Sequence, residues 1–162
     1  MRKIIDVQIG EVKAGRGRVL LNSKAIGSCV AIAAYDRKRK VGALAHVMLP
    51  GSAPQGKEDE EKTKYAADAI DLIIEELGKY GSRKEDIEIV LVGGGNVLER
   101  EDDTICKENI ESVEGLLSER GLKVQAKSVG GTCRRSIYMD VEHGVVSYTK
   151  GDDREMQLWR AL

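Results

Sequence analysis

The clearest structural signal in the chain lies in residues 29–48, which run CVAIAAYDRKRKVGALAHVM. Two apolar segments, Cys29–Tyr35 and Val41–Met48, flank the charged segment Asp36–Lys40. A short polar turn between two such segments is typical of a β-hairpin, so we expect two antiparallel strands here. This hairpin would bring Cys29 and His46 to the same open end.

Six further apolar segments outside the hairpin are short and rich in β-forming residues, and each predicts a strand. They are Ile4–Ile9, Arg18–Leu21, Ile87–Val92, Leu122–Ser128, Ser136–Val141 and Val145–Tyr148, with the turn Glu142–Gly144 joining the last two. We therefore expect eight strands, with antiparallel pairing over much of the sheet structure.

Two segments carry apolar residues at the 3.6-residue period of an amphipathic helix. The first stripe is Ala66, Ala69, Ile70, Ile73, Ile74 and Leu77, with Thr63 as the expected N-cap and Gly81 after its end. The second stripe is Cys106, Ile110, Val113 and Leu117, with Thr104 or Asp103 as the cap and Gly121 at its end. The predicted fold is α/β: mixed, largely antiparallel sheets form a sandwich with two main helices packed on one side, in α-β-β layers.

The chain has 162 residues, which is the length of a single domain. We expect that domain at residues 1–150, with a tail at residues 151–162. The tail mixes Met156, Leu158, Trp159 and Leu162 with charges. One interpretation is a short amphipathic helix that docks on the body of the protein or on a partner. The Gly- and Pro-containing stretch at residues 51–62 predicts an exposed loop.

Charge and hydropathy exclude several classes of protein. With 26 basic and 27 acidic residues the formal net charge is -1, so no nucleic-acid binding is expected. Asp6 interrupts any secretory signal, and the longest uncharged apolar segment, residues 25–35, is far short of the ~20 residues of a membrane helix. We expect a cytoplasmic protein that does not insert into membranes.

Three cysteines (Cys29, Cys106, Cys133) and two histidines (His46, His143) make up the chain's thiols and imidazoles. They include no C-x-x-C motif and no histidine pair at ligand spacing, so neither a disulfide framework nor a metal site is expected. Cys106 shares the apolar stripe of its helix and is expected in the core, whereas His143 is expected at the surface.

Cys29 and His46 have two interpretations. An imidazole beside a thiol can lower the thiol pKa from ~8.5 to between ~3.5 and ~7.5, which yields a nucleophilic thiolate. Alternatively, Cys29 fills the core and His46 is a hydrogen-bonded core group. From spacing alone, the core interpretation is the more common one.

Four stretches, in this order, resemble the chemoreceptor glutamine deamidases of the CheD family. They are Gly27–Val30, Val41–Pro50, Val92–Asn96, and Gly130–Gly131 followed by Arg134 or Arg135. The resemblance extends over residues 4–149. It implies the fold of the catalytic domain of bacterial cytotoxic necrotizing factor toxins, an α/β fold that uses a Cys-His pair and a third, orienting residue.

The resemblance implies a role for each site residue. By this resemblance Cys29 is the nucleophile and His46 is the general acid and base. Ser23, which stands where the family has Thr, orients His46. Ser keeps the hydroxyl but lacks the methyl group that limits its rotamers. The family also has an apolar residue and a Gly where this chain has Lys24 and Ala25. Because Ala tolerates positive φ less well than Gly, the conformation of this turn and the substrate preference are left open.

The implied reaction is hydrolysis of glutamine side-chain amides on the cytoplasmic helices of methyl-accepting chemoreceptors, through a thioester and with release of ammonia. Gly27, Ser28 and Asn96 are expected to bind substrate, and neither a cofactor nor a metal is needed. The alternative is a regulatory module that binds and modulates a CheC-type phosphatase. In both cases we expect a monomer when unbound.

Two glycine-rich segments remain. Gly93–Gly95 follows a predicted strand, but it lacks the Lys-Ser/Thr of a phosphate-binding loop and precedes acidic residues. We therefore favour a tight turn near Cys29 over nucleotide binding. Gly130–Arg135 predicts another turn, whose arginines are either solvated or pair with an acidic surface. Cys133, beside these arginines, is a second candidate for a thiol with a lowered pKa.

Overall fold

The predicted hairpin lies in the middle of a five-stranded sheet. In the computed structural model, which describes residues 1–162, β4 (Val30–Asp36) pairs antiparallel with β5 (Val41–Val47), and Ala31 is opposite His46. Every residue of both strands is buried. Strands of this kind need a covering layer on each face of the sheet.

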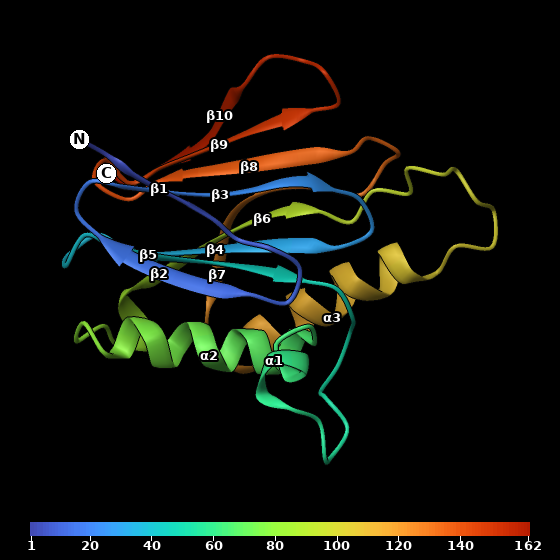
Figure 1. The fold of residues 1–162 in the computed structure, drawn as a ribbon, viewed down its shortest axis with the longest axis horizontal. Helices are drawn as coiled ribbons and strands as arrows, with labels where there is room; N and C mark the ends of the chain where they lie inside the picture. The colour runs from blue at the N-terminus through green and yellow to red at the C-terminus, as the bar shows by residue number, and fades with distance from the viewer.

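Two mixed sheets supply most of the structure (Figure 1). The helix-side sheet has the order β2-β5-β4-β6-β7 and adds β2 (Val12–Arg16), β6 (Ile87–Gly93) and β7 (Lys123–Val129). The outer sheet has the order β1-β3-β8-β9-β10, formed by β1 (Lys3–Asp6), β3 (Val19–Ile26), β8 (Arg135–Asp140), β9 (Val145–Lys150) and β10 (Met156–Arg160). Only the pairs β1–β3 and β6–β7 are parallel.

Two main helices cover the free face of the helix-side sheet (Figure 1). They are α2 (Ala66–Gly78) and α3 (Ile105–Glu119), and the single-turn α1 (Asp59–Lys62) and a 3-10 turn (Lys84–Asp86) complete the helical segments. The predicted stripes face inward, with Ile70 and Ile73 of α2 and Val113 and Leu117 of α3 all buried. The predicted α-β-β layering is therefore confirmed. None of these helices has both the length and the apolar character needed to cross a bilayer.

Alternation along β4 divides the apolar residues between two cores. Val30, Ile32 and Ala34 belong to the core between the helices and the sheet. Cys29, Ala31, Ala33 and Tyr35 belong to the core between the two sheets. This is the two-residue period of a strand buried on both faces, and it places Cys29 between the sheets.

Two strands were not predicted, and the predicted helix in the tail is wrong. The edge strand β2 forms beside β5 although Val12–Arg16 has no apolar run. The tail forms β10, which pairs antiparallel with β9, while Leu158, Trp159 and Ala161 pack against the inter-sheet core. By pairing with β9, the tail provides hydrogen-bond partners for the backbone N–H and C=O groups at this edge of the sheet. A docked helix would leave those groups without partners.

One of the two predicted helix N-caps differs from the structure. α2 begins at Ala66 with Tyr65 as its N-cap, so the prediction of Thr63 is wrong. Thr63 instead donates its hydroxyl hydrogen to the Gly10 carbonyl. At α3, Thr104 occupies the N-cap position, but it is the Asp103 carboxylate that accepts the Ile105 N–H, at 3.0 Å.

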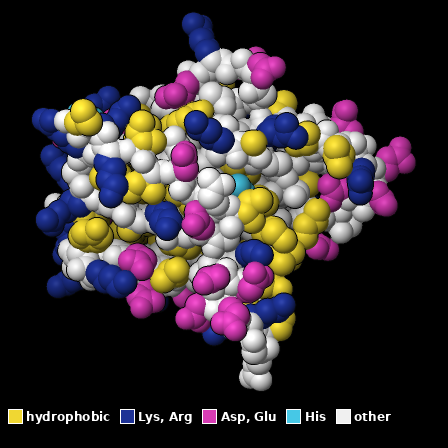
Figure 2. All heavy atoms as spheres, viewed as in Figure 1, with side chains coloured by type: hydrophobic (Ala, Val, Ile, Leu, Met, Phe, Trp, Pro, Cys, Tyr) yellow, Lys and Arg dark blue, Asp and Glu magenta, His cyan; other side chains and the backbone are white.

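Charged side chains of both signs are spread over the face drawn in Figure 2. Lys and Arg are denser toward the end of the molecule where both termini lie in Figure 1. Asp and Glu gather below and at the opposite end. No field of a single sign covers this face, in keeping with the balanced composition.

Candidate active site

Cys29 and His46 lie on the same face of the helix-side sheet. His46 is opposite Ala31 across the β4–β5 ladder, and Cys29 precedes Ala31 by two residues, so the pair is diagonal. Diagonal cross-strand neighbours have Cα atoms ~7–8 Å apart, which is within reach of long side chains. Both side chains point into the inter-sheet layer, where Cys29 is 9% exposed and His46 is 4% exposed.

Ser23 of the outer sheet reaches across the layer to His46. Its Oγ donates to the Val7 carbonyl at 2.6 Å and lies 2.7 Å from His46 Nδ1. Because the single hydroxyl proton goes to a carbonyl, Nδ1 is assigned the proton that it donates to Ser23. His46 Nε2 then carries the free lone pair, which is the form of imidazole that acts as a base.

Burial shifts both titrating groups toward their neutral forms. Burial lowers the pKa of His46, against a smaller opposing effect of the Val7 backbone. Burial also raises the pKa of Cys29, against a smaller opposing effect of its own backbone N–H. The expectation of a lowered thiol pKa is therefore wrong, because the thiol is desolvated between two sheets.

No hydrogen bond joins the Cys29 thiol to His46, although the two residues share a face. Catalytic hydrogen bonds are often long without substrate and shorten in its complex. The arrangement therefore suits transfer of the thiol proton to Nε2 during attack on a substrate.

The turn before Cys29 has the strained conformation that the sequence left open. The register of β3 against β8 shifts between Ser23 and Ile26, which marks a β-bulge. Within it, Ala25 has φ 56, in the region that favours glycine. Its N–H donates to Ser136 Oγ at 3.1 Å, which helps to hold the turn.

The Gly93–Gly95 segment fastens the loop that carries Cys29. Gly94 N–H donates to the Cys29 carbonyl at 2.7 Å, and Gly95 N–H donates to the Gly27 carbonyl at 2.9 Å. A Cβ on Gly93 would collide with the Cys29 carbonyl oxygen, and Gly93 has φ 131. These glycines allow the backbone of residues 93–95 to lie close to the backbone of the Cys29 loop, as the tight-turn interpretation predicts.

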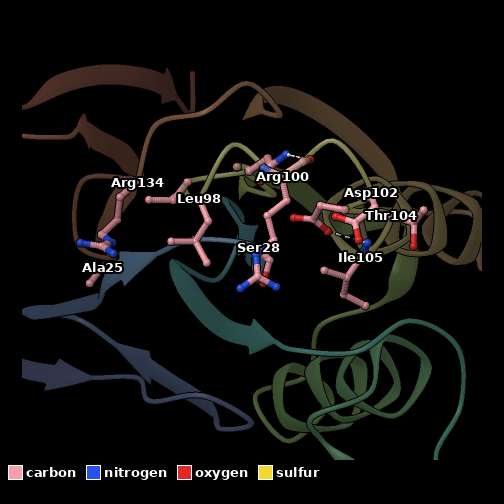
Figure 3. A pocket seen from close by; sticks show the side chains of 13 residues that line it. Ala25, Ser28, Leu98, Arg100, Asp102, Thr104, Ile105 and Arg134 are labelled. Atoms are coloured by element: carbon pink, nitrogen blue, oxygen red, sulfur yellow. Dashed lines mark hydrogen bonds between the residues drawn. The ribbon is translucent and has the colours of Figure 1, made fainter.

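Two hollows open beside the candidate site, and Cys29 itself lines neither of them. The first, of about 580 Å³, includes Gly27, Ser28 and Asn96 in its wall, and the second, of about 370 Å³, includes Ser23 and His46. Ala25 lines both. In Figure 3 the Arg100 guanidinium points toward Ser28, and Arg134 lies beside Ala25. The three residues predicted to bind substrate are thus brought to one hollow.

Asn96 contributes to this hollow mainly through its loop. Its Nδ2 donates to the Arg100 carbonyl at 2.7 Å, and its Oδ1 accepts the Arg100 N–H at 3.1 Å. Its amide is therefore occupied in closing residues 96–100. In Figure 1 the segment between β6 and α3 projects beyond the end of the sheet, where it forms one wall of the hollow.

The remaining candidates lie apart from catalysis. Arg135 is buried and donates to Ser128 Oγ and to the Gly93 and Gly130 carbonyls, so its predicted surface role is wrong, whereas Arg134 is exposed. Cys106 is buried as predicted, and burial together with Asp103 raises its pKa to about 11. Cys133 and His143 are both exposed.

Two contributors were missed. The Val7 carbonyl lies in a loop without any motif, so nothing in the sequence marks it. Asn109 lies on the buried face of α3, between Cys106 and Val113. A polar residue inside an apolar stripe was the available signal for Asn109.

The comparisons with known proteins bear on the family of the chain rather than on its single site residues. The family model described as CheD chemotactic sensory transduction matches residues 48–150. A protein of Chlorobium luteolum named "Probable chemoreceptor glutamine deamidase CheD" is 40% identical over 93% of this chain and 74% of its own length. The "Chemoreceptor glutamine deamidase CheD" of Thermotoga maritima is 36% identical over 89% of this chain and 88% of its own length.

A solved structure, the Bacillus licheniformis hypothetical protein YfiH, aligns with 75% of this chain and 51% of its own at TM-score 0.47 and 17% identity. A likeness at that level carries no inference about this chain. The family match and the two relatives are decisive, because the family model matches residues 48–150 and the relatives are 36% and 40% identical over 89% and 93% of the chain. The chain belongs to the CheD family.

Proposed function

We propose that this chain is a protein-glutamine deamidase that converts specific glutamine side chains of chemoreceptors to glutamate and releases ammonia. The names of its relatives support the substrate class. The observation that carries the chemistry is the 2.7 Å contact of Ser23 Oγ with His46 Nδ1, on the face that His46 shares with Cys29. This contact presents Nε2 as the base.

The first half of the reaction forms a thioester. His46 Nε2 takes the proton of the Cys29 thiol while Sγ attacks the carbon of the glutamine carboxamide. The resulting oxyanion needs hydrogen-bond donors, and the backbone N–H groups of Gly27, Ser28 and Cys29 donate to no acceptor in any other residue. They are therefore free to form an oxyanion hole.

The second half regenerates the enzyme. The His46 imidazolium gives its proton to the departing nitrogen, so the C–N bond breaks and ammonia leaves. Neutral His46 then takes a proton from water as the water oxygen attacks the thioester carbon. The C–S bond breaks, Cys29 recovers its proton from His46, and the substrate leaves as glutamate. No cofactor takes part in these steps.

A direct test uses the cytoplasmic fragment of a methyl-accepting chemoreceptor as substrate. Mass spectrometry locates glutamines converted to glutamate, and a coupled assay measures ammonia. We expect conversion by the parent protein and none by Cys29→Ala or His46→Ala. Conversion that persists in Cys29→Ala would overturn the proposal.

Ser23 gives a graded version of the same test. Ser23→Ala removes the acceptor for Nδ1–H, so we expect kcat to fall by about 10²-fold, the lower range for general acid–base catalysis. Ser23→Thr keeps the hydroxyl and adds the methyl group that restricts the rotamer. Its kcat should therefore equal or exceed that of the parent; a loss as large as in Ser23→Ala would exclude an orienting role for the hydroxyl.

The proposal includes a cytoplasmic monomer that acts on receptor helices. A CheC-type phosphatase stays a predicted partner and the regulatory module an alternative function. If neither the parent nor Cys29→Ala converted glutamine, while both bound the phosphatase equally and changed its rate, the regulatory module would be the function.

A further inference from the structure

The buried face of α3 carries one amide side chain, Asn109, which is 0% exposed. Its Nδ2 donates to the Ser28 carbonyl at 3.0 Å and to the Met48 carbonyl at 3.1 Å. Ser28 directly precedes Cys29, and Met48 follows His46 by two residues. A single amide group thus joins the chain just before the nucleophile to the chain just after the base.

This arrangement is unfavourable for the amide itself. Both partners are carbonyl oxygens, so the NH2 end of Asn109 must face them, and its buried Oδ1 has no hydrogen-bond partner. A buried polar atom without a partner lowers stability relative to a satisfied one. Asn109 therefore binds two backbone carbonyls while its own Oδ1 stays without a partner. Packing alone does not explain an amide at this position, because an apolar side chain would fill the space without that cost.

The Ser28 carbonyl belongs to the same peptide unit as the Cys29 N–H. Peptide units are planar, the chain has no cis peptide bond, and in a trans unit the C=O and N–H point in opposite directions. With Ser28 C=O held toward α3 by Asn109, the Cys29 N–H is directed away from α3. That N–H donates to no acceptor in any other residue.

We propose that Asn109 is a positioning residue that, through the Ser28–Cys29 peptide, aims the Cys29 N–H at the oxyanion formed during amide hydrolysis. The inference rests on the proposed deamidase function. The bond to the Met48 carbonyl, directly after β5, fixes the Asn109 amide, so this amide cannot follow a rotation of the Ser28–Cys29 peptide without breaking a second hydrogen bond. Asn109 touches neither substrate nor thiol, and it acts only through the peptide.

The expected signature is a loss in kcat with little change in KM. The oxyanion exists in the transition state and the intermediate but not in bound substrate. Removal of an oxyanion donor lowers kcat by ~10²–10³-fold. A donor that is misdirected rather than removed should cost less, so we expect Asn109→Ala and Asn109→Ser to lower kcat by about 10- to 100-fold.

Alkylation of Cys29 by iodoacetamide separates this role from a structural one. The thiolate displaces iodide at a saturated carbon, so no oxyanion forms on the reagent. If Asn109 only aims the Cys29 N–H, its variants alkylate at the parent rate while amide hydrolysis is slow. Peptide mass spectrometry assigns the label to Cys29 rather than to Cys106 or Cys133.

Val113→Ala is the matched control. Val113 is one turn further along α3, is 0% exposed, and packs in the helix-side core with an apolar side chain that cannot hydrogen-bond to the Ser28 carbonyl. The Val113→Ala substitution should lower the midpoint of urea unfolding at least as much as Asn109→Ala does, and it should leave kcat unchanged. All assays are run at a temperature where circular dichroism shows each variant folded; Asn109→Ser serves if Asn109→Ala does not fold.

The outcomes are distinct. Slow hydrolysis with normal alkylation supports the proposal. Parent-like kcat in both Asn109 variants would overturn it, and so would alkylation that slows in parallel with hydrolysis, since that indicates a displaced loop. If the parent itself converted no glutamine, the proposed function would fail instead.

Discussion

His46 and Cys29 show that burial, more than proximity, sets the protonation of this site. The imidazole is desolvated between two sheets, and Ser23 fixes its tautomer. The thiol is desolvated in the same layer. Near neutral pH both groups are uncharged, so in the proposed reaction the proton moves during attack rather than before it.

The first prediction concerns pH. His46 must be neutral to act, and its pKa lies below 6.5, so the acidic limb of kcat/KM should have its midpoint below pH 6.5. Cys29 has a pKa above 9.0, so its alkylation rate should still be rising at pH 9. The urea-unfolded chain is the control, because its thiols titrate near ~8.5. A plateau in Cys29 alkylation near pH 7 would contradict this prediction.

Ala25 carries a second prediction at this scale. Its φ of 56 costs an L-residue about 1–2 kcal/mol, whereas glycine at a position costs about 0.5–1 kcal/mol in chain entropy. Ala25→Gly should therefore raise the free energy of unfolding by up to about 1 kcal/mol, measured by urea denaturation. Ala69→Gly in α2, with ordinary helical backbone, should lower it by at least about 1 kcal/mol.

Among the elements, the Gly93–Gly95 segment has the strictest steric requirement. Gly93→Ala combines a disfavoured φ with collisions against the Cys29 carbonyl oxygen and the Ile26 side chain. We expect a loss of about 2–5 kcal/mol in the free energy of unfolding and a lower kcat, because the Cys29 loop must move.

Gly115→Ala is the control for this substitution. Gly115 lies in α3, and a Cβ at this position would meet open space. The substitution should therefore stabilise the protein by about 0.5–1 kcal/mol and leave kcat unchanged. Equal effects of the two substitutions on stability would show that the close approach at Gly93 is not required.

Much of the element structure could be predicted from the sequence, and the failures have physical causes. The apolar pattern is strong in both main helices, which pack against one core, and in the buried hairpin, which packs against two. β2 and β10 are edge strands with few buried side chains, so backbone pairing forms them without an apolar pattern. Within the site, the hairpin pattern alone made Cys29 and His46 candidates on one face, whereas Ser23 and the role of each residue came from the resemblance.

The remaining contributors to the site depend on tertiary structure. The Val7 carbonyl contacts Ser23, and Asn109 contacts the backbone beside Cys29, in each case from another segment of the chain. The rise in the pKa of Cys29 depends on the second sheet, which covers the thiol. No local sequence pattern shows that this sheet lies there. Only the assembled layers determine these properties.

At the scale of the whole molecule, the tail is part of the sandwich rather than an appendage. β10 extends the outer sheet by pairing with β9, and the Trp159 ring meets Tyr35 edge-on at 6.2 Å between centroids. The last carbonyl, of Leu162, accepts a hydrogen bond from Arg37 Nη1 at 2.9 Å. These contacts join the end of the chain to the β4–β5 hairpin.

Deletion of residues 151–162 should therefore destabilise the protein by about 3–5 kcal/mol, the cost of losing a packed Trp side chain. β9 and β8 separate β10 from β3, which carries Ser23, so kcat should be unchanged at a temperature where the shortened chain is folded. In the full-length chain, the fluorescence of Trp159, the single tryptophan, should change in the same urea range as circular dichroism. An unchanged unfolding midpoint after the deletion would instead identify residues 1–150 as a domain that folds without its tail.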